Sequence, residues 1–253
     1  MSAMAIAWIV FGCVFGAAML GLFIGEALPE HHLSQESKDV VKLGTALIAT
    51  IAALVLSLLI SSAKSSFDRM NDEIVQNAAE AVLLDRVLAD YGPETRALRD
   101  TMKRSYATTI ELLSSGDKSQ QAKLDTPEAV ARMENFQAKL RELSPQNDAQ
   151  RWLQSQALQI GSDLMETRWL VLGGLGSSVP LPFLVVVVFW LMIIFGSFGL
   201  FAPRNVTVVA VLFLCALSVA GSIFLILSMD QPFEGLMKIS SAPLRYTLSH
   251  LGQ

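Results

Sequence analysis

The sequence predicts an all-α integral membrane protein with four transmembrane helices, two at each end, and a cytoplasmic helical insert with long stalk helices between the pairs. Three observations lead to this fold class. Of the 253 residues, 52% are hydrophobic and only 17% are charged, whereas soluble domains average about 25% charged residues. Four long stretches carry no charge at all. No strand-like alternation of apolar and polar residues occurs along the chain.

Four apolar stretches are long enough to cross a bilayer, because about 20 helical residues span about 30 Å of hydrocarbon. They are Met4–Ile24, Leu43–Ala63, Leu181–Phe201 and Asn205–Met229. A charge at mid-bilayer costs at least about 2.5 kcal/mol, so charge-free windows of this length indicate spans. The first stretch lacks the basic start and the cleavage site of a secretory signal, so we expect it to be a span as well.

The spans divide the chain into a first helix pair at 1–64, a helical domain at 65–178, a second helix pair at 179–230 and a C-terminal tail at 231–253. An even number of spans places both termini and the insert on one side of the membrane. Near the span ends that side carries five basic residues and the other side carries three. The excess favours a cytoplasmic insert and cytoplasmic termini.

The second span continues into the insert as one long helix. Neither glycine nor proline occurs in the 47 residues from Thr45 to Tyr91, so about 40 Å of helix would project beyond the bilayer. Gly92 and Pro93 then predict a helix end and a new start. Thr126–Pro127 and Ser144–Pro145 predict two further helix starts in the insert.

A stripe of small and hydroxylated residues follows one side of the second span. Thr50, Ala53, Ser57 and Ser61 lie on it, and Lys64 continues it to the end of the span. Such residues let membrane helices pack closely. They also line pores, where hydroxyls replace water around an ion and a ring of charge lies at the mouth. The sequence leaves both interpretations open.

Glycine and proline interrupt the chain before the third span. Gly173, Gly174, Gly176, Pro180 and Pro182 fall within ten residues, which excludes a straight helix. One interpretation is a bend at the membrane surface. The other is a hinge, or a broken helix that lines a pathway.

Other candidate sites have simpler explanations. His31 and His32 lie beside carboxylates, but adjacent residues do not face the same way on a helix, so we expect a solvated loop. Cys13 and Cys215 both fall in apolar runs, where a thiol behaves as a small hydrophobe. No nucleotide loop, catalytic triad or metalloprotease motif is present, so the sequence predicts no enzyme, metal or cofactor. The net charge of −4 disfavours nucleic-acid binding.

Two segments, Leu28–Asp68 and Ala81–Arg96, carry a family resemblance. Their most specific pieces are Lys-Leu-Gly at the start of the second span, Ser-Ala-Lys-Ser-Ser at Ser62–Ser66, and the run Leu-Asp-Arg-Val-Leu…Tyr-Gly-Pro-Glu. The chain resembles a bacterial membrane family labelled bestrophin-like, over most of its length. That family is distantly similar to the bestrophin anion channels.

The resemblance implies a pentameric homo-oligomer in the bacterial inner membrane whose second membrane helix lines an anion-conducting pore. The aromatic constriction and the acidic calcium-binding cluster of the animal channels have no match here, so calcium gating is not expected. Two other hypotheses remain. One is a non-conducting scaffold whose helical bundle binds a protein partner. The other is a carrier that moves at the glycine–proline junction, although no inverted repeat of the usual transporter size is visible.

Overall fold

In the computed structural model the described part of the chain comprises residues 2–27, 35–115, 119, 122–174, 180–233 and 237–253, and it contains helices and no strands. The chain forms two compact units. One comprises residues 1–66 and 177–230, and the other comprises residues 67–176 and 231–253. The fold is all-α, as predicted.

Four helices of the first unit are long and apolar enough to cross a membrane. They are α1 (Ala3–Ala27), the first part of α2 (Gln35–Tyr91), α7 (Leu181–Phe201) and α8 (Val206–Met229). The helix α2 is continuous over 57 residues, and its residues contribute to both units. The predicted breaker-free helix is therefore confirmed, and the protein is a membrane protein with four spans.

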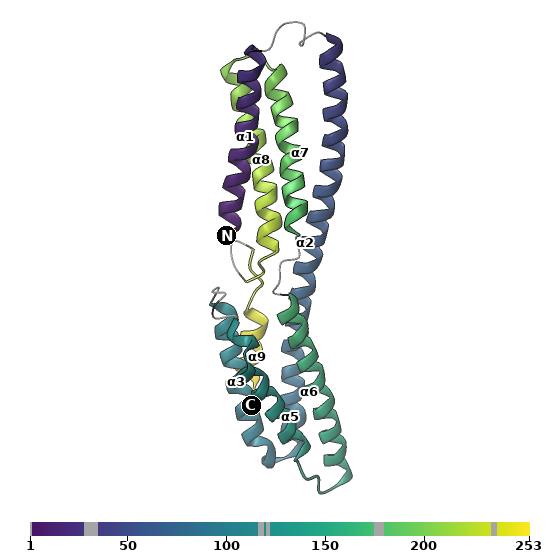
Figure 1. Cartoon of the computed structure of the whole chain (residues 1–253). Helices are drawn as coiled ribbons and strands as arrows, with labels where there is room; N and C mark the ends of the chain where they lie inside the picture. The colour runs from purple at the N-terminus through teal and green to yellow at the C-terminus, as the bar shows by residue number, and fades with distance from the viewer. Residues whose placement is uncertain (1, 28–34, 116–118, 120–121, 175–179, 234–236) are drawn as a thin grey trace. The chain divides into compact units, whose positions relative to one another are not determined.

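Helix α1 packs against α7 and α8, as Figure 1 shows. The crossing with α7 depends on glycine. A Cβ atom added at Gly21 would overlap the carbonyl oxygen of Gly196, and one at Gly199 would overlap that of Ala18. Because only glycine leaves room for two backbones at this separation, these residues set how closely α1 and α7 approach.

Arg204 lies in the turn between α7 and α8 and contacts the end of α1. Its guanidinium donates two hydrogen bonds to the carbonyl oxygen of Leu22, at 3.1 and 2.7 Å, and forms an ion pair with Glu26. It also lies 5.2 Å from the ring centroid of Phe23. A cation near the C-terminal end of α1 interacts favourably with the helix dipole. Asn205 caps α8 by accepting a 2.8 Å hydrogen bond from the Val208 amide.

The second unit is built from the last part of α2 together with η2 (Pro93–Thr95), α3 (Arg96–Ser114), η3 (Ala122–Asp125), α5 (Pro127–Arg141), α6 (Asp148–Gly174) and α9 (Ala242–His250). One hydrophobic cluster joins Leu84 and Leu88 of α2 to α3, α5 and α6. A second joins Ile74 of α2 to α3, η3 and α9. The C-terminal residues belong to this core, since Leu251 is fully buried.

The predicted helix boundaries in this unit are confirmed in two cases and wrong in one. Gly92 has a φ of +138°, a conformation that favours glycine, and Thr126 caps α5 by accepting from the Ala129 amide. Helix α6, however, begins at Asp148 and not at Ser144–Pro145. Asn147 supplies the cap instead, because its side chain accepts a 2.8 Å hydrogen bond from the Gln150 amide.

Candidate functional site

The predicted stripe on α2 lies on the face that turns away from the other helices of the first unit. The five predicted residues, Thr50, Ala53, Ser57, Ser61 and Lys64, are all exposed in the single chain. The opposite face is buried, with Thr45, Ala52, Leu59 and Ala63 each at most 7% exposed. The structure therefore brings the five residues onto one surface, and that surface is not occupied by the other helices of the same chain.

Two hydroxyl groups on this surface, those of Thr50 and Ser57, already have partners. The Thr50 hydroxyl donates a 2.9 Å hydrogen bond to the carbonyl oxygen of Ala46, and Ser57 donates one of the same length to Ala53. Both bonds join a side chain to the preceding turn of its own helix. In this arrangement the hydroxyls present lone pairs, and not hydrogens, to whatever passes along the helix.

Leucines lie alongside the hydroxyl stripe. Leu43, Leu47, Leu54 and Leu58 are each more than 60% exposed. At 100° per residue they share one side of the helix, next to the stripe. The outer surface of α2 is thus divided between a small, hydroxylated strip and a large, apolar one.

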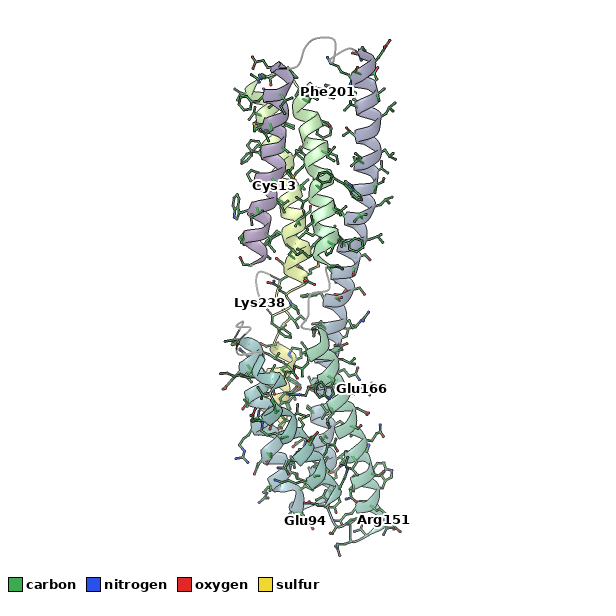
Figure 2. The ribbon with its side chains drawn as sticks, in the orientation of Figure 1. Cys13, Glu94, Arg151, Glu166, Phe201 and Lys238 are labelled. Carbon is green, nitrogen blue, oxygen red and sulfur yellow. The ribbon has the colours of Figure 1, made fainter. Side chains whose placement is uncertain are left out.

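A contact between α2 and α7 was missed in the sequence. The Thr45 hydroxyl donates to that of Ser197 across 3.3 Å. Beside this pair lies a cavity of about 270 Å³, which Lys42, Thr45, Ser197 and Phe201 help to line. Figure 2 labels Phe201 at the end of α7. Ser197 could have indicated this contact in the sequence, since it carries the sole side-chain hydroxyl in the span Leu181–Phe201. Membrane helices use such groups to form hydrogen bonds across an interface.

The residues of the predicted hinge lie on either side of a helix break. Gly173 and Gly174 occupy the last turn of α6, which ends at Gly174. Pro180 is the N-cap of α7 and Pro182 lies in its first turn, where a proline disturbs no intrahelical hydrogen bond. Gly176 lies outside the described residues. Both interpretations of this junction, a bend and a hinge, stay predictions.

A buried ion pair in the second unit was also missed. Asp85 is 1% exposed and accepts two 2.8 Å hydrogen bonds from Arg99. It accepts a third, at 3.1 Å, from the backbone amide of Gly252, and Arg99 also donates to the Gln253 carbonyl oxygen. Burial by itself raises the pKa of Asp85, but the bonds from Arg99 and Gly252 and the charges of Arg99 and Arg86 outweigh it, so the pKa is lowered. The signal was an aspartate within the apolar stripe of α2.

Among the described residues no three His, Cys, Asp or Glu side chains lie close enough to hold a metal ion. His31 and His32 fall outside the described residues. Cys13 is half-buried and Cys215 is exposed, each as a free thiol within a membrane helix. Among the described residues, the outer face of α2 is therefore the candidate functional site.

A family model described as "Bestrophin-like domain" matches residues 12–244 of the chain. This match covers the last part of α1, the other three membrane helices and most of the second unit. No curated protein and no solved structure matches the chain.

Proposed function

Because the chain belongs to the bestrophin-like family, we propose that it is a homo-oligomeric ion channel in which the first part of α2 lines the pore. The observation that supports this proposal is the exposure of Thr50, Ser57 and Ser61 on the face of α2 that its own subunit leaves uncovered. Hydroxyls on a membrane helix can replace part of the hydration shell of a passing ion. In the proposed assembly the stripes of several subunits surround one axis.

We propose further that the permeating ions are inorganic anions such as chloride. Lys64, exposed at the end of the stripe, would form a basic ring at the cytoplasmic mouth and raise the local anion concentration. The hydroxyls must then act as donors. Thr50 and Ser57 would turn their hydrogens from the preceding carbonyl toward the anion, because an anion is bound by hydrogens and not by lone pairs.

By analogy with the bestrophins, the proposed assembly is a pentamer in the bacterial inner membrane, with the second unit and both termini in the cytoplasm. Five copies of the leucine strip beside the stripe would supply apolar surface toward lipid and neighbouring subunits. The analogy, and not the site, supplies the subunit number.

The experiment is a conductance measurement in planar bilayers on purified protein. Lys64→Glu reverses the charge at the mouth, so anion current and the preference for anions over cations are both expected to fall. Thr50→Val removes a hydroxyl without changing size and is expected to reduce conductance. Leu54→Ile, on the adjacent apolar strip, is the matched control. Unchanged conductance and anion preference in Lys64→Glu would show that Lys64 has no role at a pore mouth.

A non-conducting scaffold is the second candidate, and one observation favours it. The hydroxyls of Thr50 and Ser57 are satisfied within their own helix, so the stripe tolerates lipid without any pore. The protein would then anchor in the membrane and bind a protein partner through the second unit. Flux from chloride-loaded liposomes separates the two candidates, and a ring with a continuous axial opening in images of the purified protein supports only the channel.

A further inference from the structure

The second unit contains a cavity of about 200 Å³ between α2, α3, α5 and α6. Its lining is largely apolar and includes Met102, Met133, Phe136 and Leu164. This volume lies below the roughly 300–1,000 Å³ of sites for drug-sized ligands. The space therefore suits a single alkyl chain of medium length better than a phospholipid with two chains.

The charge of the lining is of one sign. Among the described residues that line the cavity, Arg132, Lys139 and Arg168 are cationic and none is a carboxylate. The whole chain has an excess of acidic residues, 23 against 19 basic ones, so a purely cationic lining is contrary to its composition. Arg132 and Lys139 are seven residues apart on α5, and two helical turns place them on the same side.

Arg168 is a partly buried cation in the same lining. Its guanidinium donates to the carbonyl oxygen of Leu124. Burial lowers the pKa of Arg168, repulsion by Arg132 lowers it further, and Asp125 acts in the opposite direction. A bound anion between Arg132 and Arg168 would relieve both the repulsion and the loss of solvation.

We propose that this cavity binds an amphipathic monoanion, a medium-chain carboxylate, with its alkyl chain among the apolar side chains and its carboxylate at Arg168 and Arg132. Methionine side chains adapt to irregular chains, and Met102 and Met133 contribute this property to the lining. Arginine binds a carboxylate through paired, charge-assisted hydrogen bonds. The proposal does not depend on ion conduction.

The test uses the full chain in lipid nanodiscs and an octanoate analogue that carries a photoreactive diazirine on its chain. After irradiation, peptide mass spectrometry is expected to find label on peptides that contain Met133 and Leu164. Unmodified octanoate should compete at much lower concentration than octanol, which lacks the charge, or acetate, which lacks the chain. Label confined to the membrane helices would overturn the proposal, and so would equal competition by octanol or by acetate.

Three variants sharpen the result. Arg168→Gln is expected to raise the concentration of octanoate needed for competition about tenfold or more, as the loss of a charge-assisted bond does. Arg132→Gln removes an exposed charge and should act in the same direction without disturbing the fold. Ser105→Leu, on the cavity wall, keeps both arginines and should weaken labelling by filling the space.

Arg151→Gln is the matched control. Arg151 does not line the cavity, whereas Met165 and Arg168, on either side of Glu166 in the sequence, do. Figure 2 shows Arg151 well separated from Glu166 along α6. Labelling by the octanoate analogue should be unchanged in this variant. If Arg168→Gln and Arg132→Gln both label as the unmodified protein does, the carboxylate is not held there and the inference fails.

Discussion

At the scale of single residues, the stability of the second unit depends on the buried carboxylate of Asp85. Its carboxylate is almost inaccessible to solvent and is held by Arg99 and by the amide of Gly252. A buried ion pair contributes little net stability when both partners are present, but removal of one partner leaves an uncompensated charge. Asp85 therefore fastens the residues after α9 to α2 and α3.

Asp85→Asn is expected to lower the stability of the second unit by about 3 kcal/mol, because the Arg99 guanidinium would remain buried without a carboxylate. Circular dichroism during thermal unfolding checks this. Asp148→Asn is the control, because Asp148 pairs with Arg151 at a site where both side chains are at least 70% exposed, and exposed pairs contribute little. Equal melting temperatures for the two variants would contradict the assignment.

The same carboxylate predicts a pH dependence. The folded pKa of Asp85 lies below its unfolded value, which is about 3.9. The contribution is thus complete above about pH 4 and is lost as the pH falls through the folded pKa. The difference in stability between the unmodified protein and Asp85→Asn should stay constant from neutral pH to about pH 5 and shrink below about pH 4. A difference that shrank instead between neutral pH and about pH 5 would exclude Asp85 as its origin.

At the scale of elements, the close contact between α1 and α7 depends on glycines, because there is no space for a Cβ atom at these positions. Gly25 continues the pattern of Gly21, since a Cβ there would lie 2.6 Å from the Leu200 carbonyl oxygen. In lipid there is little hydrophobic force between helices, so close backbone packing supplies the association.

Gly199→Ala is expected to destabilise the first unit by about 1–3 kcal/mol, because the added methyl group overlaps backbone that cannot rotate away. The measurement is the fraction of protein that stays monodisperse in size-exclusion chromatography after heating. Gly12→Ala is the matched control on α1, since an added Cβ there meets nothing within 4 Å. If both variants tolerate heating equally, the crossing is looser than described.

The junction between α6 and α7 allows a second prediction at this scale. No atom lies within 4 Å of a Cβ built on Gly173, so Gly173→Ala adds no clash and stiffens the last turn of α6 by up to about 1 kcal/mol. If the junction is a hinge, single-channel records should show slower opening and closing with unchanged unitary conductance. Identical opening and closing kinetics in Gly173→Ala and the unmodified protein would show that Gly173 is not a hinge.

At the scale of the whole molecule, the outer face of α2 requires an explanation that one chain does not supply. Only 17% of its most apolar window is buried within the chain. The leucine strip is compatible with lipid or with a neighbouring copy, whereas the hydroxyl strip is the part that an oligomer would turn inward. The proposed assembly is therefore tested best at Ser57.

Ser57→Cys, in a background in which Cys13 and Cys215 are replaced by alanine, is expected to form disulfide-linked dimers when oxidised in membranes, because each chain then carries one thiol. Neighbouring copies of an axial residue approach one another, and a thiol pair can then close a disulfide. Leu59→Cys is the control, because Leu59 is 7% exposed and faces its own subunit. Non-reducing electrophoresis distinguishes the two. Monomers alone from Ser57→Cys would argue against an axial stripe.

The sequence by itself determined the class, the spans and the long helix α2, because each depends on local composition. Charge-free length predicts a span, and the absence of glycine and proline predicts continuity. The Thr126 cap is likewise local. The stripe of Thr50, Ser57 and Ser61 could be recognised from helical periodicity alone, before any neighbour was known.

The tertiary structure alone decided which groups meet. Asp85 and Arg99 are close in sequence, but the Gly252 amide that completes the site lies 167 residues from Asp85. Other contacts also join segments far apart in the chain. They are the glycine contacts of α1 with α7, the hydrogen bonds from Arg204 to Leu22 and the cationic cavity around Arg168. Such contacts depend on packing between distant elements, and helical periodicity, which shows only which side of a helix a residue occupies, does not contain that information.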